Sequence, residues 1–186
     1  MSFKSLIALP LLLAALQAAS EDDLTFTLNG NNEYSVSGCD PSASGILDIP
    51  DTYNGKPVTS IGQYAFQSCS GITNISIPNS VASIEDYAFY ACTSLNNITI
   101  PSSVTSMGVG TFYNCSDLTS IAIPNSVSSI GSNTFYACSD LTNITIPGSV
   151  ASIGSNAFYN CSSLTSIAIP NSVTSIGSSA FFGCSD

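Results

Sequence analysis

The stretch that decides the fold is LTSIAIPNSVSSIGSNTFYACSD, residues 118–140. Residues 141–163 read LTNITIPGSVASIGSNAFYNCSS, and residues 164–186 read LTSIAIPNSVTSIGSSAFFGCSD. The same spacing of 23 residues separates successive prolines from Pro78, phenylalanines from Phe66 and cysteines from Cys69. A fixed period of this size is typical of a solenoid, in which each repeat buries its apolar face only against its neighbours.

Each repeat begins with a short alternating segment. Ile121 and Ile123 alternate with Ser120 and Ala122, which predicts a strand with one buried face. Pro124 ends the hydrogen bonding of that strand. Strands of successive repeats should pair in parallel, so six of them would form a ladder roughly 25–30 Å long.

The rest of the repeat should return the chain to the next strand. Val127 and Ile130 are expected to point inward, and Gly131 to permit a backbone turn that other residues resist. Phe135 and Cys138 are three residues apart, which is the spacing of one helical or 3₁₀ turn.

The repeat pattern L-x-x-I-x-I-P-x-S-V-x-S-I-G-x-x-A-F-x-x-C closely resembles the BspA-like leucine-rich repeat. Residues 49–66, IPDTYNGKPVTSIGQYAF, resemble the entry unit of that family, and the resemblance covers about residues 24–186. It implies a secreted or cell-surface protein, with adhesion to host proteins or other cells in several members, but supplies no catalytic or fixed binding residues. The predicted fold is an α/β-type repeat solenoid, with a parallel β-sheet on the concave face and a short strand plus 3₁₀ or helical turns on the convex face.

Three regions are expected along the chain. Residues 1–20 combine a lysine, a short apolar run and small residues, the pattern of a cleaved signal peptide. A membrane anchor is the alternative, but a span needs roughly 20 apolar residues and this run is shorter. Residues 21–45 should form an N-terminal β cap of two strands around Asn29-Gly30. Residues 46–186 should form a solenoid of about six units with an incomplete last unit, either because the chain is a fragment or because that end is open.

Composition argues against several classes of function. Twelve acidic residues against two basic ones exclude a nucleic-acid partner, which needs clustered Lys and Arg. The chain has no histidine, so Ser-His-Asp and Cys-His catalysis are impossible. Adjacent Glu85 and Asp86 should point to opposite faces of an extended segment. With no C-x-x-C pair either, we expect no enzyme, no metal and no cofactor.

The cysteines allow two interpretations. Six of them, from Cys69 to Cys184, should stack at a spacing inside the roughly 4.4–6.8 Å window of disulfides. Each also follows a core phenylalanine by three residues, which favours a small buried hydrophobe. Cys39 lies outside this column and has no periodic partner.

The predicted binding surface is the outward, uncharged face of the long strands, which suits hydrogen bonding to an extended peptide or glycan. Its residues are Asn74, Ser76, Asn97, Thr99, Ser120, Ala122, Asn143, Thr145, Ser166 and Ala168. Five N-x-S/T sequons are candidates for glycosylation: Asn74, Asn97, Asn114, Asn143 and Asn160.

The sequence therefore predicts a non-enzymatic extracellular interaction or adhesion module that binds a protein or glycan partner. No transmembrane segment is expected once the signal peptide is removed. The alternatives are an inert solvated face, an ice-binding solenoid, and a structural surface or coat glycoprotein that self-associates through its uncapped C-terminal end.

Overall fold

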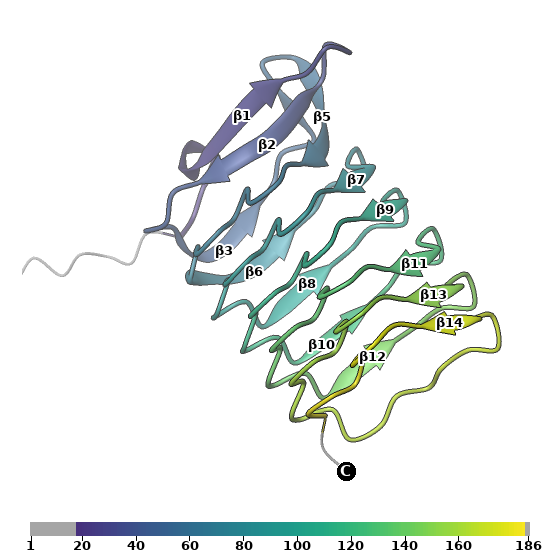
Figure 1. The fold of residues 1–186 in the computed structure, drawn as a ribbon. Coiled ribbons are helices and arrows are strands. Elements are labelled where there is room, and N and C mark those ends of the chain that lie inside the picture. Colours follow the sequence, from purple (N-terminus) through teal and green to yellow (C-terminus); the bar gives the residue numbers. More distant parts are fainter. Residues whose placement is uncertain (1–17, 185–186) are drawn as a thin grey trace, which may run out of the picture.

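The computed structural model describes residues 18–184 as a β-solenoid of about six turns with a period of about 23 residues (Figure 1). Apart from its last three residues, the predicted signal peptide lies outside the described residues. Within residues 18–184, no helix is long and apolar enough to cross a membrane.

The N-terminal part is a β-hairpin that lies on the first turn of the solenoid. After the 3₁₀ helix η1 (Glu21–Asp23), β1 (Leu24–Leu28) and β2 (Tyr34–Cys39) pair antiparallel. The loop between them is longer than a two-residue Asn29-Gly30 turn. The Asn29 Oδ1 accepts hydrogen bonds from the N–H groups of Asn31 (2.9 Å) and Glu33 (3.0 Å), so this side chain organises the loop.

A second hairpin joins the N-terminal part to the repeats. β4 (Thr52–Tyr53) pairs antiparallel with β5 (Lys56–Ile61) around Asn54 and Gly55, which both have positive φ, as a tight hairpin turn requires. β5 also pairs in parallel with β2, so the first hairpin continues the sheet of the solenoid.

One side of the solenoid is built from the longer strands. β3 (Ser44–Asp48), β6 (Gly71–Ser76) and β8 (Asn97–Thr99) pair in parallel, as do β10 (Ser120–Ala122) and β12 (Asn143–Thr145). The sixth predicted strand is absent, because residues 164–170 have no strand and bow away from β12 (Figure 1). This segment has a neighbouring coil on one side only, and Ile169 remains 37% exposed.

A second side is built from two-residue strands with the sequence Ser-Ile or Ser-Met. They are β7 (Ser83–Ile84), β9 (Ser106–Met107), β11 (Ser129–Ile130), β13 (Ser152–Ile153) and β14 (Ser175–Ile176). They pair in parallel as β5-β7-β9 and β11-β13-β14.

The third side consists of turns and contains none of the expected 3₁₀ or helical segments. In the fourth coil, the Cys138 N–H donates to the Phe135 carbonyl at 3.2 Å, which closes a single turn. Asn133 and Ala137, two residues before and after Phe135, have φ near 57°. Left-handed residues cannot continue a right-handed helix, so the turn ends after one hydrogen bond.

At these turns, backbone N–H groups point along the stack and donate to carbonyl groups of the following coil. Phe135 N donates to Ala157 O at 2.8 Å, and Ala137 N donates to Tyr159 O at 2.7 Å. The turn side therefore carries its own ladder of hydrogen bonds between coils, and all three sides hold neighbouring coils together.

Two columns of the core run along the stack. Phe66, Phe89, Phe112, Phe135 and Phe158 are fully buried and stack in parallel at 5.1–5.6 Å between ring centroids. Beside them, each cysteine from Cys92 to Cys184 donates its S–H to the carbonyl of the phenylalanine 26 residues earlier. Five of the column cysteines, Cys69, Cys92, Cys115, Cys138 and Cys161, are buried in this core.

The glycine that ends the short strand is explained by close approach, not by a left-handed turn. Gly131 and Gly154 do not have positive φ. A Cβ added to Gly154 would overlap with the backbone N of Ser132 in the preceding coil. At Gly154 the two coils are thus too close for a side chain.

Candidate functional site

Four adjacent strands place eight of the ten predicted binding residues on one surface, the outward side of β6, β8, β10 and β12, which we call the long-strand face. The alternating residues Ile98, Ile121 and Ile144 point into the core and are at most 7% exposed. Asn74 is half-buried and the other seven predicted residues are exposed. Ser166 and Ala168 are also exposed, but they lie in the segment that forms no strand.

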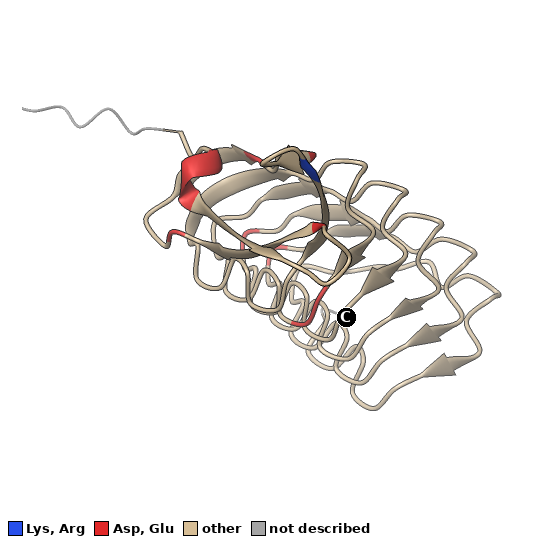
Figure 2. Cartoon of the chain, turned by 90° about the horizontal axis from the view of Figure 1, so that it is seen from above, with Lys and Arg blue, Asp and Glu red and all other residues tan. Residues whose placement is uncertain are grey.

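The long-strand face is polar, uncharged and only slightly hollowed. A depression of about 270 Å³ lies between β8 and β10 and is lined by Asn97, Thr99, Ser120 and Ala122 with the intervening isoleucines. Acidic side chains concentrate near the N-terminal end of the described chain, and Lys56 is the single basic residue of residues 18–184 (Figure 2). The face can therefore offer hydrogen bonds but no ion pairs.

The predicted glycosylation sites fall into two structural classes. Asn74, Asn97 and Asn143 lie on the long-strand face, with Asn74 directly beside Asn97. Asn114 and Asn160 occupy the left-handed turn position two residues after the core phenylalanine, with φ of 59° and 57°. Asparagine tolerates this conformation better than most residues, so these two have a structural reason to be there.

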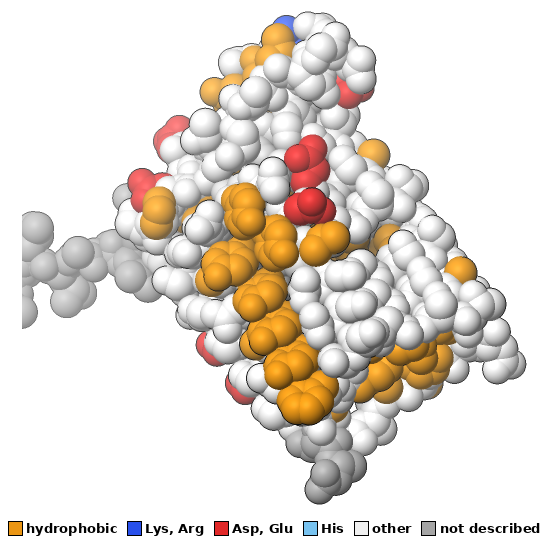
Figure 3. Space-filling model, in the orientation of Figure 1, with side chains coloured by type: hydrophobic (Ala, Val, Ile, Leu, Met, Phe, Trp, Pro, Cys, Tyr) orange, Lys and Arg blue, Asp and Glu red, His pale blue; other side chains and the backbone are white. Residues whose placement is uncertain are grey.

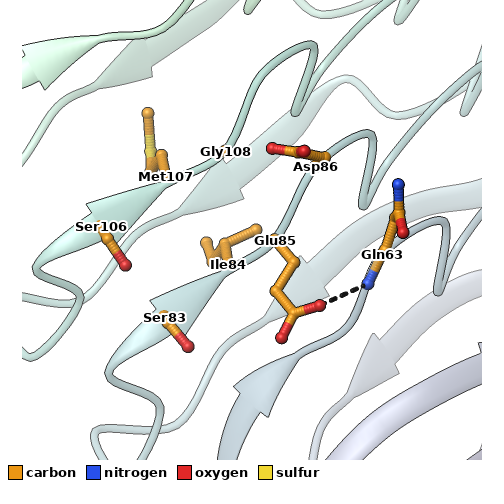
Figure 4. A pocket seen from close by; sticks show the side chains of 8 residues that line it. All are labelled: Gln63, Ser83, Ile84, Glu85, Asp86, Ser106, Met107 and Gly108. Carbon is orange, nitrogen blue, oxygen red and sulfur yellow. Dashed lines mark hydrogen bonds between the residues drawn. The ribbon is translucent and has the colours of Figure 1, made fainter.

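A second hollow, of about 360 Å³, surrounds the paired carboxylates (Figure 4). Glu85 accepts a hydrogen bond from Gln63 N in the preceding coil at 3.1 Å, whereas Asp86 accepts one from Val109 N in the following coil at 2.7 Å. The two side chains bond in opposite directions along the stack, but both are exposed at the same hollow and do not lie on the opposite faces that were predicted. They hold neighbouring coils and do not converge on a common point as an acid–base pair would.

The most prominent surface feature is a band of aromatic rings that the sequence reasoning missed. It occupies the turn side, beside the buried phenylalanines, and runs along the stack (Figure 3). We call it the aromatic stripe, and it consists of Tyr64, Tyr87, Tyr90, Tyr113, Tyr136, Tyr159 and Phe182. The recurring dipeptide Phe-Tyr or Phe-Phe in successive repeats is the signal that could have revealed it.

Most rings of the stripe are stacked face to face. The ring centroids of Tyr113 and Tyr136 lie 4.4 Å apart, with an angle of 5° between the ring planes. Those of Tyr136 and Tyr159 lie 4.7 Å apart, with an angle of 1°. Neighbouring rings therefore cover each other's faces, and the stripe presents ring edges and phenol hydroxyls to solvent. Burial and the neighbouring Tyr136 raise the pKa of Tyr113, so this phenol is neutral at physiological pH.

The stripe changes column at its N-terminal end. Tyr64 and Tyr87 stack on each other, and each precedes a core phenylalanine by two residues in the sequence. The other members of the stripe follow a core phenylalanine by one residue. The ring centroids of Tyr64 and Tyr90 lie 6.2 Å apart with their planes at 74°, so the two rings meet nearly edge-on. An open pocket of about 430 Å³ lies at this corner. A Cβ on Gly110 would overlap with the Tyr87 ring, so this glycine makes room for the change of column.

Nothing in the described residues suggests metal chemistry: residues 18–184 contain no group of three His, Cys, Asp or Glu side chains that could hold a metal ion. The fully buried thiols of Cys115, Cys138 and Cys161 are also unsuited to chemistry. Burial raises the pKa of Cys161 to about 12, and it raises the pKa values of Cys115 and Cys138 well above the ordinary value.

Comparison with protein-family models identifies the repeat that the sequence pattern resembles. Residues 59–186 match the model of the BspA type leucine-rich repeat region in six copies. The chain belongs to this BspA-type family. Membership indicates a protein-interaction or surface module, and neither the family nor the solved relatives give evidence for an enzyme.

Solved structures of other leucine-rich repeat proteins share the fold of this BspA-type chain. The leucine-rich repeat protein of T. pallidum aligns with 90% of this chain and 89% of its own, at 23% identity and a TM-score of 0.73. A leucine-rich cell surface protein from Faecalibacterium prausnitzii aligns at 30% identity and a TM-score of 0.65. The pneumococcal vaccine antigen PcpA aligns at 21% identity and a TM-score of 0.66.

Each of the latter two alignments covers 90% of this chain, which spans about half the length of those two proteins, 52% and 48%. Among curated proteins, no sequence matches this BspA-type chain.

Proposed function

We propose that this protein is an extracellular interaction or adhesion module that binds a protein or glycan partner, with the aromatic stripe as its main contact surface. The observation that carries the proposal is the continuous band of seven rings on the surface of the turn side. The stacked phenylalanines fill the core behind this band. Tyrosine is enriched in the energetically dominant contacts of interfaces, and a large exposed apolar patch marks a site of interaction.

The long-strand face is the second contact surface of this proposal. Its eight Asn, Ser, Thr and Ala side chains can bind an extended partner through many weak hydrogen bonds, but they include no large anchoring residue. Two further observations support a surface role: a structural relative is described as a cell surface protein, and another as a vaccine antigen. The signal peptide predicted for residues 1–20 would bring the chain to that compartment.

The two surfaces can be separated with two sets of variants. Tyr136→Gln with Tyr159→Gln alters the stripe, and glutamine is the residue that the first repeat carries at this position, as Gln67. Asn97→Lys with Ser120→Lys and Asn143→Lys alters the long-strand face. Biolayer interferometry against a defined panel of immobilised extracellular proteins and oligosaccharides then compares the three forms.

We expect the wild type to bind a member of the panel, the glutamine variant to lose at least tenfold in affinity, and the lysine variant to bind nearly as well as wild type. The opposite order would assign binding to the long-strand face. Equal binding by all three forms would contradict both assignments.

A self-associating structural or coat glycoprotein is the alternative proposal, and one observation favours it. In the last described coil Ile176 is 51% exposed and Phe182 is 60% exposed, and the outer edge of β14 is unpaired within the described chain. Such an edge can pair with another chain. Sedimentation at high concentration tests this alternative, and a strictly monomeric profile would exclude it. Mass spectrometry of the natural glycoprotein would show whether sugars on Asn74, Asn97 and Asn143 cover the long-strand face.

A further inference from the structure

The first cysteine of the buried column differs from the five that follow it. From Cys92 onward, each thiol donates to a phenylalanine carbonyl in the preceding coil at 3.0–3.2 Å. Cys69 belongs to the first repeat, and no such phenylalanine precedes it. Its Sγ lies 3.6 Å from two carbonyl oxygens of the N-terminal part, those of Cys39 and Asp40.

The fold brings the unpaired cysteine of the sequence to this same place. Cys39 is the last residue of β2 and is half-buried against the core. Its Sγ lies 3.6 Å from the Asp40 carbonyl oxygen, which is also within 3.6 Å of the Cys69 Sγ. Both thiols therefore converge on one oxygen atom, although 29 residues separate them in the sequence.

We propose that Cys39 and Cys69 form a disulfide that fastens the N-terminal hairpin to the first repeat. The oxidant is a small or protein disulfide, such as oxidised glutathione or a thiol–disulfide oxidoreductase. The half-exposed Cys39 first forms a mixed disulfide and releases one glutathione. The Cys69 sulfur then attacks the Cys39 sulfur and displaces the second glutathione. In total the two protein thiols lose two protons and two electrons, and one glutathione disulfide becomes two glutathione molecules.

Exposure favours Cys39 as the site of the first step, and the electrostatics of the pair favour the second. A hydrogen bond between the two thiols raises the pKa of Cys39 and lowers that of Cys69. The buried Cys69 is thus the better thiolate, which is the form that attacks in the second step. The later column is different, because burial raises the pKa of every cysteine from Cys92 to Cys184 and each has its own carbonyl acceptor.

The cross-link would also have a structural consequence. It closes a loop that contains β3, β4 and β5, and it joins the end of β2 to the turn side of the first coil. Terminal units of a solenoid have a neighbour on one side only, so a cap that covers such a unit gains from covalent attachment.

The experiment starts from the purified, fully reduced protein. Samples are equilibrated near pH 8 in glutathione buffers from mostly reduced to mostly oxidised, trapped by alkylation and denatured. Chymotrypsin then cleaves at Tyr53 and Tyr64, between the two cysteines, and mass spectrometry identifies the products. We expect one pair of joined peptides, two hydrogens lighter than the separate peptides, with the five other cysteines recovered as alkylated thiols.

A thermal melt gives the second measurement. The oxidised protein should melt roughly 5–15 °C higher than the reduced protein, as expected for a disulfide that closes a loop of this length. In Cys39→Ser, which keeps the shape of the side chain, the melting temperature should not depend on the glutathione ratio. Seven free thiols in excess oxidised glutathione would overturn the proposal, and so would a disulfide between members of the later column.

Discussion

The phenylalanine column allows a quantitative test of how the coils stabilise one another. Phe112 is fully buried, and its ring is parallel to Phe89 at 5.2 Å and to Phe135 at 5.6 Å. Phe181 lies at the end of the described column, is only partly buried, and stacks on Phe158 alone, at 5.3 Å. The same substitution at the two positions should therefore have different costs.

The expected magnitudes follow from burial and from the number of stacked neighbours. Phe112→Ala leaves a cavity and should lower the free energy of unfolding by about 3–5 kcal/mol. The two stacked contacts account for roughly 0.5–1.5 kcal/mol each within that sum. Phe181→Ala loses one contact and less buried area, so we expect about half that cost. Phe112→Leu keeps most of the apolar volume but loses both stacks, and it should cost about 1–2 kcal/mol.

Equilibrium urea unfolding measures these differences. The chain has eight tyrosines and no tryptophan, so tyrosine fluorescence and far-UV circular dichroism can follow the transition. We expect the largest loss of stability for Phe112→Ala. Phe112→Leu keeps most of the apolar volume but loses both stacked contacts, so its loss separates the effect of stacking from that of burial. If Phe112→Ala and Phe181→Ala had equal effects within about 0.5 kcal/mol, stacking along the column would not be the source of stability.

Two further predictions concern the glycine corner and the buried thiols. Gly154→Ala should lower the free energy of unfolding by about 1–3 kcal/mol because its Cβ would overlap with backbone. Gly148→Ala, whose Cβ would meet nothing within 4 Å, should change it by less than about 0.5 kcal/mol, and equal effects in parallel thermal melts would refute the close-approach explanation. Burial raises the pKa of Cys161 to about 12 and those of Cys115 and Cys138 well above the ordinary value, so the folded protein holds neutral thiols. The contribution of these neutral thiols to the free energy of unfolding is complete below the pKa of an unfolded thiol, about 8.5. It is lost as the pH rises toward the pKa values of the folded protein. The melting temperature should therefore fall from about pH 8 to about pH 10, and a fall in Cys138→Ala as steep as in wild type would contradict this cause.

The features that the sequence predicted correctly are those that depend on one repeat alone. The alternation around Ile121 places its side chain inside, and the period places Phe135 and Cys138 in buried columns. These predictions needed no knowledge of how one coil lies on the next.

The features that the sequence did not predict depend on contacts between coils. The glycine corner is set by the distance to the preceding coil, and the turns end early because left-handed residues such as Ala137 bond to the following coil. The aromatic stripe and the meeting of Cys39 with Cys69 likewise arise from stacking and from the path of the N-terminal hairpin.

The three ladders also restrict how this protein can change in length. Ser120 pairs with Asn143 and Ser129 with Ser152, while the Phe135 N–H bonds to the carbonyl of Ala157 in the next coil. One residue inserted within a strand would turn the side chains that follow it in that strand from the core to the surface. The ladders are therefore preserved when such a gene grows or shrinks by in-frame gain or loss of whole units. Each gained unit that keeps Phe-Tyr would add one ring to the stripe, so the reach of the binding surface would evolve in fixed steps.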